Sequence, residues 1–148
     1  MILLVFSILA VCNCYSIDLL GNTISQAKSK MSKDYPDVKI DEADNNQGGK
    51  TLFQDLPDVI HFAYFNKKGI CNLERMWPKT DAATKRIKST LMTVSYVHYL
   101  DERTAAYVYK IKVEDRIVRV DYCLNDGVWA FEYYYLNSNG TREMFNQG

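Results

Sequence analysis

The chain has 148 residues, which is enough for one domain of ordinary size and too few for two. Lysine and arginine together number 18, and so do aspartate and glutamate, so the formal net charge is zero. This balance argues against nucleic-acid binding, which needs a basic excess. Hydrophobic residues make up 47% of the chain and charged residues 24%, which excludes a disordered protein.

The first 16 residues predict a secretory signal peptide. They carry no charged side chain and are apolar over residues 2–11, a stretch too short to cross a bilayer as a helix, which needs about 20 residues. Small residues place the cleavage after Ser16, so residues 17–148 are expected to form a single exported domain, periplasmic or secreted. No later stretch is long and apolar enough to span a membrane.

Two other interpretations of this N-terminal segment stay open. Leu9-Ala10-Val11-Cys12 approximates a bacterial lipobox, so a lipid anchor on Cys12 is an alternative to free secretion, although Val11 is bulky for that motif. A buried N-terminal strand is the other alternative. Both compete with a signal peptide that is removed.

Signal cleavage would leave one pair of cysteines, Cys71 and Cys123, in an oxidising compartment. A bridge between them would stabilise the fold by about 4 kcal/mol in the chain-entropy model. The strand register derived below places the two thiols on opposite faces of one sheet, where they cannot be bridged, but a bulge would reverse this. Zinc binding by these cysteines with His61 and His98 is not expected, because no two of these residues have a short metal-ligand spacing.

Two helices are predicted. Thr23 and Gln26 are spaced as a capping box, and Tyr35-Pro36 ends the first helix. Thr80 or Asp81 caps the second. The residues expected on the buried sides of the two helices are Ile24, Ala27, Met31, Ala83, Ile87 and Leu91.

Residues 37–50 are expected to form a polar, mobile connection, because residues 45–49 read Asn-Asn-Gln-Gly-Gly. From residue 51 onward the remaining segments are typical of strands, and no sequence repeat is visible. A hairpin is predicted over residues 59–76 with its turn at residues 66–69. The more apolar face of this hairpin is expected to point into the core, and it carries Ile60, Phe62, Tyr64, Cys71 and Leu73.

Residues 94–135 predict four consecutive strands. Asp126-Gly127 is a strong hairpin signal, and Glu114-Asp115 marks the turn before it. The pairs that these turns predict are Leu124–Trp129, Tyr122–Phe131, Val120–Tyr133, Val118–Tyr135, Ile111–Val118 and Tyr109–Val120, with Val94, Tyr96 and His98 on the same face. The predicted fold class is therefore α+β, an antiparallel sheet made of a hairpin and a four-stranded meander, with two helices packed on its aromatic face.

The second face of the meander carries the candidate partner-binding residues, which are Lys110, Lys112, Arg119, Asp121, Glu132 and Tyr134. In the derived register Asp121 lies directly opposite Glu132, a like-charge pair that normally destabilises a sheet, and the diagonal Arg119 could relieve the repulsion. Two carboxylates beside arginine and tyrosine could also serve acid–base chemistry. The plainer alternative is a solvated face whose charges have no task.

His61 is expected to pair with Glu74 across the hairpin as a surface contact. No phosphate loop, metalloprotease motif or nucleophile elbow is present in the sequence, so no catalytic residue, metal or cofactor is assigned. Eleven tyrosines, six phenylalanines and two tryptophans are a heavy aromatic load. Those on the outer side, such as Tyr99 and Tyr134, suit contact with a protein partner.

Two short motifs resemble those of small exported bacterial proteins of unknown function. They are Leu19-Leu20-Gly21-Asn22-Thr23 at the start of the first helix and Tyr64-Phe65-Asn66-Lys67-Lys68-Gly69-Ile70-Cys71 in the hairpin. The Gly-x-Thr helix start is also similar to that of outer-membrane-assembly lipoproteins and of β-lactamase-inhibitor-like proteins. Those proteins work by binding other proteins, and no functional residue is carried over from them.

These observations predict an exported, non-enzymatic protein that binds another protein through the outer face of its sheet or its polar loop. A carrier of a small apolar ligand, held between the helices and the sheet, is the second hypothesis, and it requires a cavity of about 300 Å³ or more. An enzyme that uses Asp121 and Glu132 is the third.

Overall fold

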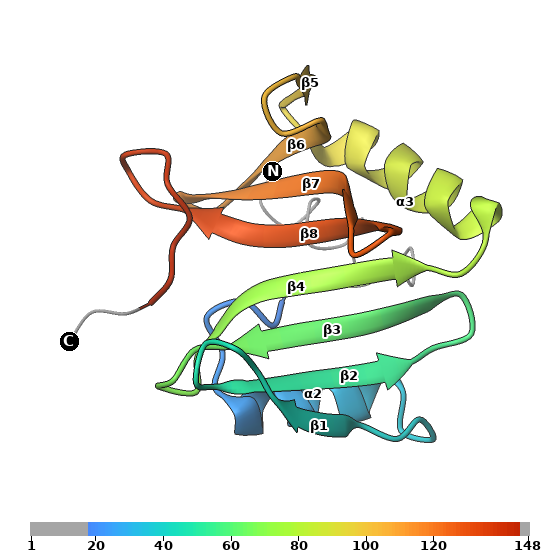
Figure 1. Ribbon diagram of the computed structural model, residues 1–148, viewed down its shortest axis with the longest axis vertical. Helices are drawn as coiled ribbons and strands as arrows, with labels where there is room; N and C mark the ends of the chain where they lie inside the picture. The colour runs from blue at the N-terminus through green and yellow to red at the C-terminus, as the bar shows by residue number, and fades with distance from the viewer. Residues whose placement is uncertain (1–17, 146–148) are drawn as a thin grey trace.

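The computed structural model describes residues 18–145, and an antiparallel sheet of eight strands with two helices confirms the α+β class (Figure 1). The predicted signal peptide and Cys12 lie outside the described residues. Within residues 18–145 no helix has the length and apolar character that crossing a membrane would need. The elements are α2 (Ile24–Asp34), β1 (Asp41–Asp44), β2 (Lys50–Asp55), β3 (Val59–Phe65), β4 (Cys71–Pro78), α3 (Asp81–Val94), β5 (Val97–Asp101), β6 (Ala106–Val113), β7 (Arg116–Asn125) and β8 (Val128–Leu136).

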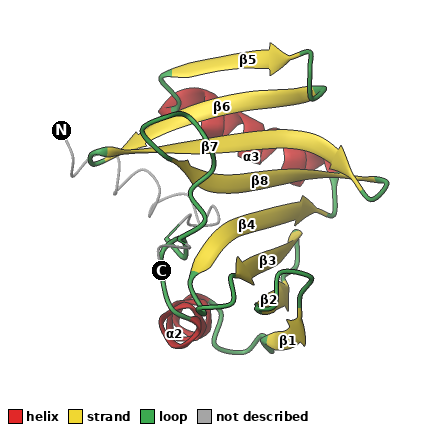
Figure 2. Cartoon of the chain, turned by 60° about the vertical axis from the view of Figure 1, so that its left-hand side comes forward, coloured by secondary structure: helices red, strands yellow, loops and turns green. Residues whose placement is uncertain are grey.

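The strand order is β1-β2-β3-β4-β8-β7-β6-β5, and it divides the molecule into two halves of the same plan. Each half is a helix followed by four strands that pair in chain order, and the last strands of the halves, β4 and β8, pair with each other. Figure 2 shows the β5–β8 half with α3 behind it, and α2 beside the β1–β4 half. This repeat of structure has no counterpart that is visible in the sequence.

Both helices begin at the predicted caps. In α2 the Gln26 amide donates to Thr23 Oγ1 (3.3 Å) and the Thr23 amide donates to Gln26 Oε1 (2.9 Å), so the capping box is confirmed. In α3 the cap is Thr80, whose Oγ1 accepts a hydrogen bond from the Ala83 amide (3.1 Å). The helix continues to Val94, so the prediction of Val94 as a strand residue is wrong.

The register predicted from the last two turns is confirmed. Asp126 and Gly127 alone separate β7 from β8, and both have positive φ, as this tight turn requires. Glu114 and Asp115 separate β6 from β7. The observed pairs include Leu124–Trp129, Tyr122–Phe131, Val120–Tyr133, Val118–Tyr135, Ile111–Val118 and Tyr109–Val120.

The predicted faces of the first hairpin are wrong. The buried residues of β3 are the alternate ones, such as His61 and Ala63, whereas Phe62 and Tyr64 are half-exposed. A β-bulge between Tyr64 and Phe65 shifts the register. The bulge pairs Cys71 with buried Phe65, so Cys71 does lie in the core, although not for the predicted reason.

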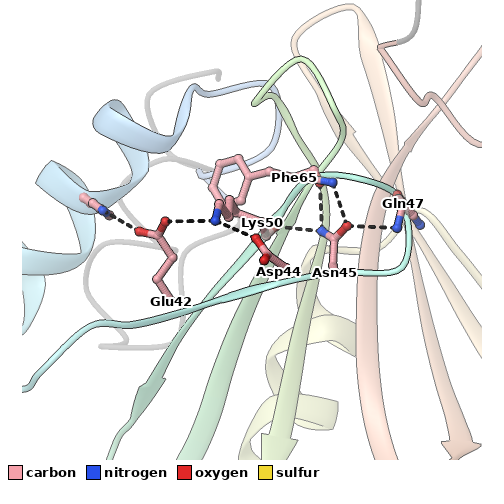
Figure 3. A network of polar contacts seen from close by, with 8 residues as sticks. Glu42, Asp44, Asn45, Gln47, Lys50 and Phe65 are labelled. Atoms are coloured by element: carbon pink, nitrogen blue, oxygen red, sulfur yellow. Dashed lines mark hydrogen bonds and ion pairs between the residues drawn. The ribbon is translucent and has the colours of Figure 1, made fainter.

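The prediction of a mobile loop over residues 37–50 is also wrong, because this segment contains β1 and an ordered turn (Figure 3). The Asn45 side chain holds the turn together. Its Nδ2 donates to the carbonyls of Lys50 (2.8 Å) and Phe65 (2.9 Å), and its Oδ1 accepts from the amides of Gln47 and Gly49 (3.0 Å each). The same side chain therefore closes the β1–β2 turn and ties it to the end of β3.

One hydrophobic cluster joins the helices to the sheet. It combines the buried residues of α2 and α3 with alternate strand residues of both halves. Its members are Leu19, Leu20, Ala27, Met31, Leu52, Leu56, Val59, Ala63, Phe65, Cys71, Met76, Ala83, Ile87, Leu91, Tyr109, Ile111, Val118, Val120, Phe131 and Tyr133. We call the side of the sheet that contributes to this cluster the core face, and the opposite side the outer face.

Replacement of Asn45 by alanine should lower the free energy of unfolding by about 2 kcal/mol or more, because it removes four hydrogen bonds at a partly buried turn. Asn46→Ala is the matched control, since Asn46 is exposed in the same turn. Urea denaturation of both variants tests this expectation. Equal stability of the two variants would show that the turn does not depend on the Asn45 side chain.

Candidate partner-binding face

All six residues predicted to form the binding surface lie on the outer face. Lys110 pairs with Arg119, which pairs in turn with Tyr134, and Asp121 pairs with Glu132 in the neighbouring row. Lys112 lies two residues along β6, and because side chains alternate along a strand it shares the face with Lys110. The register thus brings the six side chains to one side of β6, β7 and β8.

Asp121 is held by two donors from its own half of the sheet. Its Oδ1 accepts from Arg119 Nε (2.7 Å) and its Oδ2 accepts from the Tyr134 hydroxyl (2.6 Å). Arg119 also reaches Asp101 Oδ2 at the end of β5 (3.5 Å). The side chains of Arg119 and Asp121 are only 18% and 14% exposed, so the group is mostly withdrawn from water.

Glu132 is stabilised by a residue of the other half, and Arg119 relieves the like-charge repulsion by binding Asp121 rather than Glu132. Arg75 Nη2 on β4 donates to Glu132 Oε1 (2.9 Å), and Asn125 Nδ2 donates to the same oxygen (2.8 Å). Because Asp121 and Glu132 each have their own donors, the like-charge pair is compensated. The Glu132 side chain is 15% exposed, so it is not the freely solvated group of the plainer alternative.

Arg75 links this polar network to an aromatic group on β2, β3 and β4. Its Nη1 donates to the Tyr64 hydroxyl (2.9 Å), and its guanidinium lies 5.1 Å from the centre of the Tyr64 ring. Phe62 stacks against Phe53 (5.8 Å between ring centres), Tyr64 (6.2 Å) and Trp77 (6.1 Å). These four rings are half-exposed.

A single row of paired residues crosses the outer face from one edge of the sheet to the other. Each member is the register partner of the next. From β1 to β5 the row reads Asp41, Phe53, Phe62, Arg75, Glu132, Asp121, Val108 and Tyr99. Aromatic rings therefore occupy the positions of the row on β2 and β3, and ion-paired side chains occupy its centre on β4, β8 and β7.

The two lysines contact aromatic rings near β5. Lys110 Nζ lies 5.7 Å from the centre of the Tyr99 ring, and Lys112 Nζ lies 4.9 Å from that of Tyr96. Such cation–π contacts are worth about 0.5–1 kcal/mol at exposed sites. They order the end of the outer face next to the sheet edge.

Burial dominates the protonation of two groups on this face. Burial, and then the hydrogen bond to Asp121, raises the pKa of the Tyr134 phenol well above its ordinary value. Burial, with smaller contributions from Glu132 and Asp121, raises the pKa of the Cys123 thiol to about 11. Both groups therefore keep their protons at neutral pH.

The contact between His61 and Glu74 is confirmed, but it is buried and lies on the core face. His61 Nε2 is 2.9 Å from Glu74 Oε1, and the two side chains are 9% and 0% exposed. Burial raises the pKa of Glu74, and the interaction with His61 opposes this shift. The prediction of a surface contact is wrong because the hairpin faces are reversed.

Sequence reasoning missed Arg75, Phe53 and Trp77 as members of the outer face. Alternation along β4 could have placed Arg75 and Trp77 on the same side of the strand. The contact of Arg75 with Glu132 could not be found in this way, because the pairing of β4 with β8 joins residues more than 50 positions apart. Among the described residues, no group of three or more His, Cys, Asp or Glu side chains could hold a metal ion.

No family model, curated protein or solved structure matches this chain.

Cys71 and Cys123 are both free thiols, one buried in the core and the other half-buried on the outer face. In the chain that begins at Ile17, both should react slowly with iodoacetamide near neutral pH, because burial raises the pKa of each thiol. Denaturation without reductant should then allow both to be labelled, as counted by mass spectrometry. An unlabelled denatured protein that takes up two labels only after reduction would contradict this expectation.

Replacement of Tyr134 by phenylalanine should lower the free energy of unfolding by about 1–3 kcal/mol near neutral pH, because it removes a hydrogen bond to a carboxylate. The pKa of Tyr134 is raised in the folded protein, so its contribution is complete below the ordinary tyrosine value near 10 and declines as the pH rises above that value. The difference between wild type and variant should therefore shrink in alkaline solution.

Denaturant unfolding of wild type and Tyr134→Phe across this pH range measures the difference. Tyr96→Phe is the control, because the Tyr96 side chain is 49% exposed. A gap between wild type and Tyr134→Phe that grows with pH would contradict the assignment.

Proposed function

We propose that this protein is an exported, non-enzymatic domain that binds another protein through the outer face of its sheet. In this proposal both helices pack on the core face and leave the outer face of the β1–β4 hairpins and the β5–β8 meander uncovered. The single hydrophobic cluster that contains the buried residues of both helices supports this arrangement. Export rests on the uncharged, apolar residues 1–16.

The observation that carries the proposal is the group of aromatic rings beside Arg75 on the outer face. Half-exposed Phe62, Tyr64 and Trp77 lie beside an arginine that is already fixed by two hydrogen bonds. Tyrosine, tryptophan and arginine are the residue types that dominate binding energy at protein interfaces. Because Arg75 is already ordered, little side-chain entropy is lost when a partner covers it.

The charged side chains of this face favour binding over acid–base catalysis. Each carboxylate accepts hydrogen bonds from fixed donors: Arg119 and Tyr134 hold Asp121, and Arg75 and Asn125 hold Glu132. A partner would therefore meet a surface of compensated charge rather than an excess of one sign. Aromatic and polar groups, with few uncompensated charges, are the complement that such a surface suits.

The hypothesis of an apolar-ligand carrier has less support. It needs space between the helices and the sheet, and the helix side chains that face the cluster are buried among strand residues. Ala27, Met31, Ala83, Ile87 and Leu91 are each at most 4% exposed.

The test begins with the protein recovered from the exported fraction of its natural source. Mass spectrometry should give an N-terminus near Ile17, or a lipid on Cys12, and recovery of the chain with Met1 in the cytosol would contradict export. The exported protein is then immobilised and used to capture its partner from the same fraction.

Phe62→Ala should weaken binding of the captured partner by about thirtyfold or more, because Phe62 lies at the centre of the stacked rings. Leu124→Ala is the control, since Leu124 is an exposed apolar residue at the tip of the β7–β8 hairpin. Thermal unfolding must show that both variants are folded. Equal binding by both variants, or capture of no protein at all, would contradict the proposal.

A further inference from the structure

The sheet has two edge strands, β1 and β5, and they differ in how they discourage pairing with another strand. An edge strand exposes backbone donors and acceptors, and natural proteins usually protect it with charge, proline or a bulge. β1 reads Asp-Glu-Ala-Asp, and Lys28, Lys39 and Lys50 form ion pairs with its carboxylates. This edge is thus lined by three carboxylates and the lysines that pair with them, and such charged side chains discourage the addition of another strand.

β5 has no such protection. It reads Val-His-Tyr-Leu-Asp, so lysine, proline and glutamate are absent from the strand, and its first four residues are exposed. Its inner edge pairs with β6, and no other described strand pairs with its outer edge. Its backbone can therefore accept one more antiparallel strand.

Most of the exposed apolar side chains gather at this edge. Seven large hydrophobic residues are exposed among those described, and four of them lie on β5 or directly before it. These four are Tyr96 (49% exposed), Val97 (38%), Tyr99 (36%) and Leu100 (59%). Val97 and Tyr99 face one side of the sheet and Leu100 the other, so the edge is apolar on both sides.

We propose that two copies of this chain associate by pairing β5 with β5, antiparallel and about a two-fold axis near Tyr99. Such a pairing sets the start of β5 in one copy beside its end in the other. Lys110 is the register partner of Val97 at the start, and Lys112 lies over Tyr96 nearby.

The opposite end of β5 carries the complementary charge. Asp101 ends the strand and is already paired with Arg119, so the carboxylate left to meet another copy is that of exposed Glu102, which precedes Arg103. The two-fold pairing therefore brings Lys112, near the start of β5 in each copy, toward Glu102 of the other, while Tyr99 at the centre of the strand meets Tyr99 of the second copy. A parallel pairing would set like charges side by side.

This self-complementarity selects a second copy over an unrelated strand. An extended segment of another protein could use the same backbone groups, but it would need the same charge order and apolar centre by coincidence. One strand pair with flanking side chains is a small interface. The association is therefore expected to be weak, with a dissociation constant on the order of micromolar.

Sedimentation equilibrium of the chain from Ile17 onward, from low to high micromolar concentration, tests this proposal. The wild type should change from monomer to dimer with concentration. Leu100→Lys should weaken the dimer by tenfold or more, because it places a charge on the free edge. Leu124→Lys is the matched control: Leu124 is 57% exposed, close to the 59% of Leu100, but lies on the β7–β8 hairpin. It should dimerise like the wild type.

A charge exchange tests the antiparallel geometry. Glu102→Lys alone should weaken the dimer, and Glu102→Lys combined with Lys112→Glu should restore much of it, because opposite charges again meet. Circular dichroism establishes that each variant is folded. A wild type that stays monomeric, a dimer that survives Leu100→Lys, or a double variant weaker than the single one would overturn the proposal.

Discussion

The pairing of β4 with β8 is the constraint on which the rest of the structure depends, because it alone joins the two halves of the sheet by strand pairing. The register there runs through Glu74–Tyr133, Arg75–Glu132 and Met76–Phe131. Different interactions hold it on the two faces. The ion pair between Arg75 and Glu132 forms on the outer face, while Glu74, bound to His61, and Met76 are buried on the core face. A slip of one residue would move Arg75 into the core and Glu74 out of it, and both changes would leave a charge without its partner.

The sequence predicts the β5–β8 half well and the β1–β4 half poorly, for physical reasons. In the β5–β8 half, Glu114-Asp115 and Asp126-Gly127 are local turn signals, and each turn fixes the register of a whole strand pair. In the β1–β4 half the choice of the more apolar face as the core face is misleading, because Phe62 and Tyr64 face outward while His61 and Glu74 occupy the core. A buried polar pair is stabilised by its partner, and pattern alone does not reveal that partner.

The candidate site follows the same division: its residues in the β5–β8 half can be predicted from the sequence, and the residue from the β1–β4 half cannot. The turns place Asp121, Glu132 and Tyr134 on one face, since their register is local. Arg75 completes the site from the other half, and its role depends on a pairing across more than 50 residues. The polar segment around Asn45 was missed for a related reason: an asparagine in a glycine-rich stretch is typical of a mobile loop, yet here its side chain makes four hydrogen bonds.

The outer face and the β5 edge are continuous, because the row that begins at Asp41 ends at Tyr99. Under the proposed two-fold pairing, Tyr99 of one copy would lie beside Tyr99 of the other, and the two rows would join into one. The stacked rings of β2 and β3 would then lie far from the axis in each copy, with the ion-paired centres between them. A partner bound at the rings would leave the β5 edge free, so self-association and partner binding would not compete. A partner that carries two copies of its binding segment could then contact both copies of the dimer. Once the first segment is bound, the second is held at high effective concentration, so the overall affinity rises without any new contact.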